Sequence, residues 1–254
     1  MEIRPLGQDL SIYNKFNFTM PPVGVKFSLS KPEGMEQLDE EHAFCEMFKV
    51  AQQKEKAFYI TKENENCSGK MPLGWMGEMP AWAESGMIGD KFEIFQEPRA
   101  NKRLYDRFYK FKPGLINYVA FARLDNLTFE PDVLILTTKP SQAEIVLRAM
   151  TYSTGELWQA KDTPVLGCSW LYIYPYISGN VNYSITGMHF GMKAREVLPE
   201  GYILVSIPYN WIATITQNLQ EMKWVLPAYS LGREKWLEKE KESYEELAQT
   251  YGDK

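Results

Sequence analysis

Three cysteines are the residues of this sequence with the most distinctive chemistry, and they lie far apart along the chain. Cys45 falls in a segment with helical spacing, whereas Cys67 and Cys168 stand near Gly69 and Gly167 in turn-like contexts. Glycine lets backbone N–H groups approach a sulfur atom and stabilise a thiolate or a cluster sulfide. Three thiolates that converge in the fold can hold a cubane iron–sulfur cluster, 4Fe-4S, and leave one iron open to a small molecule.

Other interpretations of the same cysteines stay open. Zinc in a Cys₃His shell is one of them, because His42 precedes Cys45 by about one helical turn. A nucleophilic thiol at Cys67 or Cys168 is another. The third is structural, since free cysteine is among the most buried residue types and no Cys-x-x-Cys pair marks a metal site in this sequence.

A second group of candidate residues lies between positions 187 and 195. His189, Lys193 and Arg195 stand there in a glycine-containing loop, where their cations can hold a carboxylate or phosphate group of a ligand. The alternative is an ordinary solvated basic loop. The sequence contains only two histidines, which excludes a histidine-rich metal site.

Composition limits the classes of protein to which the chain can belong. Its 254 residues are 44% hydrophobic and 24% charged, which is ordinary globular usage and excludes a disordered or collagenous chain. The formal net charge of -5 argues against a nucleic-acid-binding protein, which would need a basic excess. No apolar run approaches the roughly 20 residues that span a bilayer, and the N-terminus lacks a signal-peptide core. With three widely spaced cysteines, these features predict a cytoplasmic protein without membrane or nucleic-acid partners.

Hydrophobic periodicity predicts the elements that must position the candidate residues. Apolar residues at steps of three or four predict helices from residue 36 to about 52, and over 98–111, 141–152 and 209–222. We therefore predict an α/β or α+β fold, a single compact domain over 1–254 with a mixed sheet flanked by helices. Residues 233–254 are predicted to form a C-terminal amphipathic helix. Short β-branched or aromatic runs predict strands at 23–27, 57–61, 116–123, 133–138, 170–176, 182–186 and 202–207.

A weak internal sequence similarity suggests pseudo-duplication of this domain. A strand, a Lys-Pro pair and a helix follow one another from residue 23 and again from residue 133. A cysteine near a glycine comes after each of the two helices. This internal similarity predicts two similar halves that face each other across a site.

Several short motifs follow one another along most of the chain. They include the segments at 22–27, 45–48 and 58–61, then Cys67-Ser68-Gly69-Lys70, and later residues 131–133, Gly167-Cys168 and 203–208. From about residue 20 to residue 225, this arrangement resembles an uncharacterised prokaryotic family, the domain of unknown function 169. The family has no established activity to carry over. It is common in anaerobes, so the resemblance implies an oxygen-sensitive cluster.

We predict that the protein binds an iron–sulfur cluster through Cys45, Cys67 and Cys168, with zinc as the alternative metal. The open coordination position would serve redox or Lewis-acid chemistry on a small-molecule substrate, or with a redox partner. The alternative function is a metal-free small-molecule-binding or scaffold protein with structural core cysteines. Its pocket would lie under residues 75–90, which are rich in Met, Trp and Gly. The sequence does not decide whether the protein is an enzyme or a homo-oligomer.

Overall fold

The computed structural model describes residues 4–185 and 189–252, whose named strands form a seven-stranded sheet. In chain order the strands are β1 (Val23–Ser28), β2 (Glu36–Gln37), β3 (Phe58–Ile60), β4 (Tyr118–Arg123), β5 (Val133–Thr138), β6 (Asn182–Ile185) and β7 (Ile203–Pro208). Across the sheet their order is β2-β3-β4-β1-β5-β7-β6. β2 and β3 are parallel, and the other neighbouring pairs are antiparallel. The predicted mixed sheet is therefore confirmed.

β1 lies at the centre of the sheet because its sequence can be buried on both faces. Val25 pairs with Phe121 of β4 on one side and with Val133 of β5 on the other. The only cation of β1, Lys26, is buried and reaches Asp132 with its ammonium nitrogen 2.8 Å from Oδ1. This ion pair satisfies a charge that would otherwise be costly to bury.

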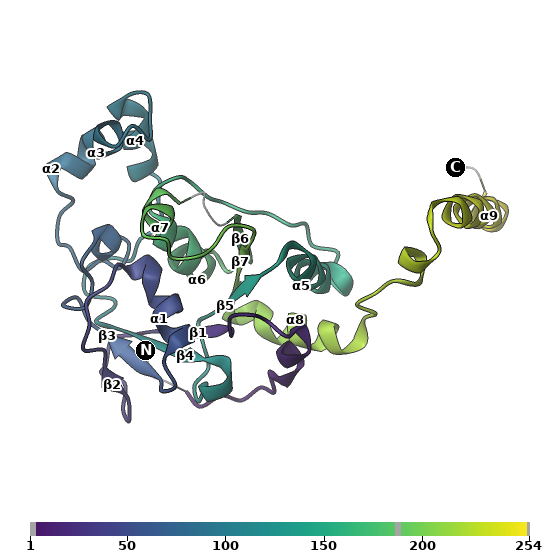
Figure 1. Ribbon diagram of the computed structural model, residues 1–254, viewed down its shortest axis with the longest axis horizontal. Helices are drawn as coiled ribbons and strands as arrows, with labels where there is room; N and C mark the ends of the chain where they lie inside the picture. The colour runs from purple at the N-terminus through teal and green to yellow at the C-terminus, as the bar shows by residue number, and fades with distance from the viewer. Residues whose placement is uncertain (1–3, 186–188, 253–254) are drawn as a thin grey trace. The chain divides into compact units, whose positions relative to one another are not determined.

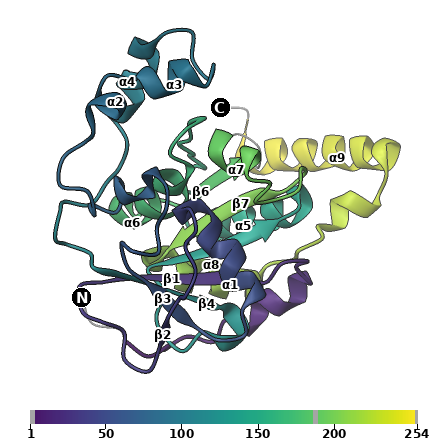
Figure 2. The same ribbon diagram turned by 60° about the vertical axis from the view of Figure 1, so that its left-hand side comes forward.

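Helices cover both faces of this sheet, as predicted for an α/β domain. α1 contacts β1 and β4, and α6 contacts β7. Figure 1 shows α1 and α6 on one side of the strands and α8 on the other, and Figure 2 shows α1 crossing in front of the sheet. The helices are α1 (Met47–Gln53), α2 (Ala81–Glu84), α3 (Met87–Lys91), α4 (Pro98–Tyr105), α5 (Pro140–Tyr152), α6 (Tyr174–Ser178), α7 (Phe190–Ala194), α8 (Tyr209–Glu221) and α9 (Arg233–Tyr251).

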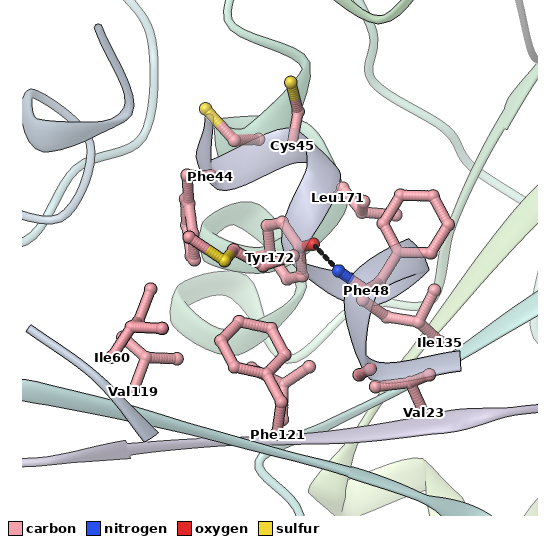
Figure 3. Packing of buried hydrophobic residues seen from close by; sticks show 14 of the residues in the cluster. Val23, Phe44, Cys45, Phe48, Ile60, Val119, Phe121, Ile135, Leu171 and Tyr172 are labelled. Atoms are coloured by element: carbon pink, nitrogen blue, oxygen red, sulfur yellow. Dashed lines mark hydrogen bonds between the residues drawn. The ribbon is translucent and has the colours of Figure 1, made fainter. Parts of the chain in front are cut away.

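The main core lies between the sheet and the α1 side. Phe44 stacks on Tyr172 with ring centroids 4.4 Å apart, and the Tyr172 hydroxyl accepts the Phe48 N–H at 3.3 Å. Figure 3 shows these rings above Phe121 of the sheet, with Cys45 at the end of the core away from the strands. Burial of such aromatic side chains supplies the largest apolar areas of a core. The candidate site is thus built on a rigid, packed base.

Two predicted elements are wrong, and the predicted helix over 98–111 is too long, because α4 ends at Tyr105. The segment 36–52 is not one helix, because β2 starts it, residues 44–46 form a 3₁₀ turn, and only α1 is α-helical. Long-range bonds hold the first part extended: the Leu38 N–H donates to the Tyr59 carbonyl at 2.9 Å. The run 170–176 is a π-helical turn over Ser169–Ile173 followed by α6, not a strand. A continuous apolar run does not distinguish a buried helix from a buried strand.

The chain separates into two compact units, Met1–Gln220 and Glu221–Lys254. The first contains the sheet, and the second contains α9, whose described part agrees with the predicted C-terminal helix. Residue 186 of the predicted strand 182–186 and residues 253–254 of the predicted helix lie outside the described residues. The single domain over 1–254 and the pseudo-duplication stay predictions.

Candidate functional site

The structure brings most of the predicted site residues to one small cavity of about 60 Å³, which we call the cysteine cavity. Its walls come from the turn before α1, the loop after β3, the turn before α6, and α7. A space of this volume has room for no more than a few water molecules. The predicted residues that line it are Cys45, Cys67, Gly69, Cys168, His189 and Arg195.

Two of the three cysteines are buried. Cys45 is 9% exposed and Cys168 is 6% exposed. Burial, reinforced by the neighbouring cysteines, raises the pKa of the Cys45 thiol to about 12 and raises the pKa of Cys168 well above its ordinary value. Both side chains therefore keep their protons at neutral pH and are weak nucleophiles.

Cys67 has a different environment, because it is only half-buried and has a cation beside it. The Arg195 guanidinium donates through Nη2 to the Cys67 sulfur at 3.3 Å. Arg195 is itself held by the Gly191 carbonyl, which accepts from Nη1 at 3.1 Å, and its Nε lies 3.9 Å from Oε2 of Glu46. The Cys67 sulfur therefore accepts a charge-assisted hydrogen bond.

Glu65 ties together the two loops that carry Cys45 and Cys67. Its side chain is completely buried and accepts the Phe44 N–H at 3.1 Å through Oε1 and the Lys70 N–H at 3.2 Å through Oε2. Burial raises the pKa of this carboxyl to about 7, although the backbone donors oppose the shift. The sequence marks Glu65 only as an acid without a partner, since its donors are backbone groups.

Two glycines make the cavity possible by leaving room for larger neighbours. A Cβ at Gly69 would lie 2.5 Å from the Phe44 Cβ and 2.7 Å from Glu65 Oε1. A Cβ at Gly167 would lie 2.5 Å from the His189 ring. Contacts this short are not tolerated without movement, so both positions require glycine for close approach.

The predicted cationic loop is divided between two environments. His189 is buried, with its Nε2 2.5 Å from Asp162 Oδ1 and its Nδ1 3.1 Å from the Met192 sulfur. Lys193 is exposed, lies 3.3 Å from Glu200, and does not line the cavity. Binding of one anion by His189, Lys193 and Arg195 together stays a prediction. His42, the proposed zinc ligand, contacts Glu40 at 3.3 Å and does not line the cavity either.

An adjoining pocket of about 200 Å³ opens from the cavity at Cys67. Its polar lining includes Cys67, Ser68 and Arg195, and its other lining residues are mostly apolar side chains of the α3, α4 and α7 region and of the segment 165–166. Phe92 and Phe190 meet there with ring centroids 5.5 Å apart. Such a mainly apolar space with a few polar groups is typical of sites for small organic molecules.

A family model described as uncharacterised ArCR, domain of unknown function 169, matches residues 11–218. The chain belongs to this family. The predicted resemblance is therefore confirmed. The uncharacterized protein MJ0308 of Methanocaldococcus jannaschii is 27% identical over 210 residues, which cover 81% of this chain and 89% of that protein. No solved structure matches.

The predicted metal-binding function of this family member is wrong. Among the residues that the structure describes, no group of three or more His, Cys, Asp or Glu side chains is arranged to hold a metal ion. Cys45, Cys67 and Cys168 line one cavity, but their side chains do not form such a group with one another or with a neighbouring ligand. The iron–sulfur centre, its zinc alternative and the open coordination site are therefore not supported by the ligand geometry.

Within residues 4–185 and 189–252 of this chain, no helix has the length and apolar character needed to cross a bilayer.

Proposed function

We propose that this protein is a metal-free binding protein for a small organic molecule that carries one anionic group. The observation that supports this proposal is the 200 Å³ pocket, whose lining is mainly apolar and includes the Arg195 guanidinium. An acyl chain would lie against Phe92 and Phe190, and its carboxylate would meet the guanidinium. A cation in the lining of an apolar pocket fixes the orientation of such a ligand.

The three cysteines then have separate structural roles. Cys45 and Cys168 fill the protein interior as small apolar residues, and Cys67 lies at the junction between the cavity and the pocket. Free thiols fit a reducing compartment, so we propose a cytoplasmic location. Oligomerisation and a redox partner stay predictions.

Titration of the full chain with octanoate and with octan-1-ol tests this proposal. The two probes have the same chain length, and they differ in the group that would meet Arg195. Octanoate is expected to bind at least about tenfold more tightly, because a charge-assisted hydrogen bond is worth more than 1 kcal/mol. The difference should persist in excess chelator, since no metal takes part.

Arg195→Met is expected to remove the preference for octanoate. Phe190→Ala is expected to weaken the binding of both probes. Lys193→Met is the matched control, because Lys193 lies two positions away and outside the pocket. Circular dichroism verifies that each variant is folded. Equal binding of the two probes by the unaltered protein, or an equal loss in the Lys193 variant, would contradict the proposal.

A further inference from the structure

A second and larger open space lies on the other side of the His189–Asp162 contact from the cysteine cavity. We call it the cationic cleft; it has a volume of about 690 Å³, and its walls are the end of α4 with residues 107–110 and the segment 160–163. None of its lining residues lines the cysteine cavity or the adjoining pocket. A volume of this size suits a ligand as large as a mononucleotide.

The cleft has an excess of positive charge. Its lining includes the three cations Arg107, Lys110 and Lys161, against one carboxylate, Asp162, which is already engaged with His189. All three cations are exposed. Within the described part of the chain, the Arg107 guanidinium makes no hydrogen bond or ion pair. These groups can therefore turn to an anion without breaking a strong existing pair.

Aromatic rings form the inner wall of the cleft. Tyr109 meets Trp170 edge-to-face, with ring centroids 6.1 Å apart and planes at 71°. The Trp170 indole N–H donates to Thr163 Oγ1 at 2.7 Å. The Ser169 hydroxyl donates to the Tyr109 backbone carbonyl at 2.6 Å, and the Tyr109 ring packs against Tyr174 with centroids 4.9 Å apart. A wall fixed before binding lowers the entropic cost of holding a flat ligand.

The cations and the rings lie close together. The Lys161 ammonium stands 5.6 Å from the Tyr109 ring centroid and 5.4 Å from that of Tyr174, and Lys110 stands 5.3 Å from the Phe108 ring. A ligand that reaches the Tyr109 ring therefore also reaches the Lys161 ammonium, and Lys110 lines the same cleft. Stacking of a base on an aromatic side chain favours binding whatever the base is, because every base has a π-face.

We propose that the cationic cleft binds a flat heteroaromatic ring that carries a phosphate group, the chemistry of a mononucleotide. The ring stacks on Tyr109, and the phosphate oxygens accept hydrogen bonds from Lys161, Lys110 and Arg107. The ligand is a single small molecule, because the chain's net charge of -5 opposes the approach of a long polyanion. This site is additional to the proposed octanoate pocket and does not depend on it.

Calorimetric titration of the full chain with adenosine 5′-monophosphate, adenosine and inorganic phosphate tests the proposal. Adenosine 5′-monophosphate is expected to bind at least tenfold more tightly than either fragment, because only it uses both the rings and the cations. Lys161→Met and, separately, Arg107→Met should each weaken its binding several-fold and leave adenosine binding unchanged. Both side chains are exposed, so the variants should fold.

Lys112→Met is the matched control, since Lys112 is exposed and lies just outside the cleft lining. The Lys112→Met variant should bind adenosine 5′-monophosphate, adenosine and phosphate with the same binding constants as the unaltered protein. Equal affinity for adenosine and its monophosphate, or the same loss in the Lys112 variant, would overturn the proposal. Arg195→Met should leave nucleotide binding intact, so failure of the octanoate pocket is distinguishable from failure of this cleft.

Discussion

The cysteine cavity and the cationic cleft are opposites in accessibility and charge. The cavity has about 60 Å³ and is closed around thiols and a buried carboxyl, whereas the cleft has about 690 Å³ and exposes three cations beside aromatic rings. The residues with the most distinctive chemistry therefore lie where a ligand cannot reach most of them. Lysine, arginine and tyrosine, which are common on surfaces, form the more accessible site.

The two spaces also share a wall. His189 lines the cavity and Asp162 lines the cleft, and the two side chains are in contact. On the cavity side, the His189 ring packs closely against Gly167. On the cleft side, polar contacts hold the loops, such as the hydrogen bond from the Trp170 indole to Thr163. We expect substitutions in the cavity to change stability and substitutions in the cleft to change binding.

The largest expected effect is a loss of stability when one methyl group is added to the cavity wall at Gly69. Gly69→Ala should lower the free energy of unfolding by roughly 3–4 kcal/mol, because the new Cβ would press on Phe44 and the Glu65 carboxyl. Urea denaturation measures the change. Gly77→Ala, where a Cβ meets no atom within 4 Å, should stay within roughly 1 kcal/mol of the unaltered protein. Similar stabilities for the two variants would show that the cavity is not tightly packed.

The second expected effect is a pH dependence of stability that arises from Glu65. Its pKa is raised from 4.5 to about 7 on folding, so the folded state binds more protons between these values. The Glu65 contribution is therefore fully present below pH 4.5 and is lost as the pH rises through 7. The loss amounts to up to about 3 kcal/mol, from 1.36 kcal/mol per pKa unit.

Urea denaturation of the unaltered protein and of Glu65→Gln across pH 4.5–7.5 isolates this contribution. The glutamine keeps an acceptor oxygen but has no proton to titrate, so the stability of the unaltered protein relative to the variant should fall as the pH rises. The exposed Glu63 is the control, and Glu63→Gln should leave the pH-dependent fall in place. If the free energy of unfolding changed with pH in the same way in Glu65→Gln and in the unaltered protein, Glu65 would not be the cause of the pH dependence.

The smallest effect distinguishes the three cysteines from one another. Iodoacetamide in the native protein should modify Cys67 at least about tenfold faster than Cys45 or Cys168, because only Cys67 opens on a pocket and has a guanidinium beside it. Mass spectrometry of peptides gives the three rates. In concentrated urea the rates should become similar, which is the internal control. Fastest modification of Cys168 would mean that the cavity opens to solvent.

Much of the fold can be predicted from local pattern. The β-branched, bounded runs of β1 and β5 are recognisable as strands, and the helical spacing after Pro208 marks α8. The segment 36–52 cannot be predicted in this way, because long-range hydrogen bonds to residues near β3 override its helical spacing. For the candidate site, residue type indicates the three cysteines and Arg195 but not Glu65, whose partners are backbone N–H groups of Phe44 and Lys70.

The amino-acid order alone was enough to specify a mixed α/β domain and the family, because alternation, helical spacing and short motifs are local properties. The state of the site depends on contacts between distant segments. Burial protonates Cys45 and Cys168, a guanidinium 128 positions away stands beside Cys67, and the cleft forms only where residues 107–110 meet 160–163. Desolvation and charge proximity are properties of three-dimensional surroundings, so no linear pattern reports them.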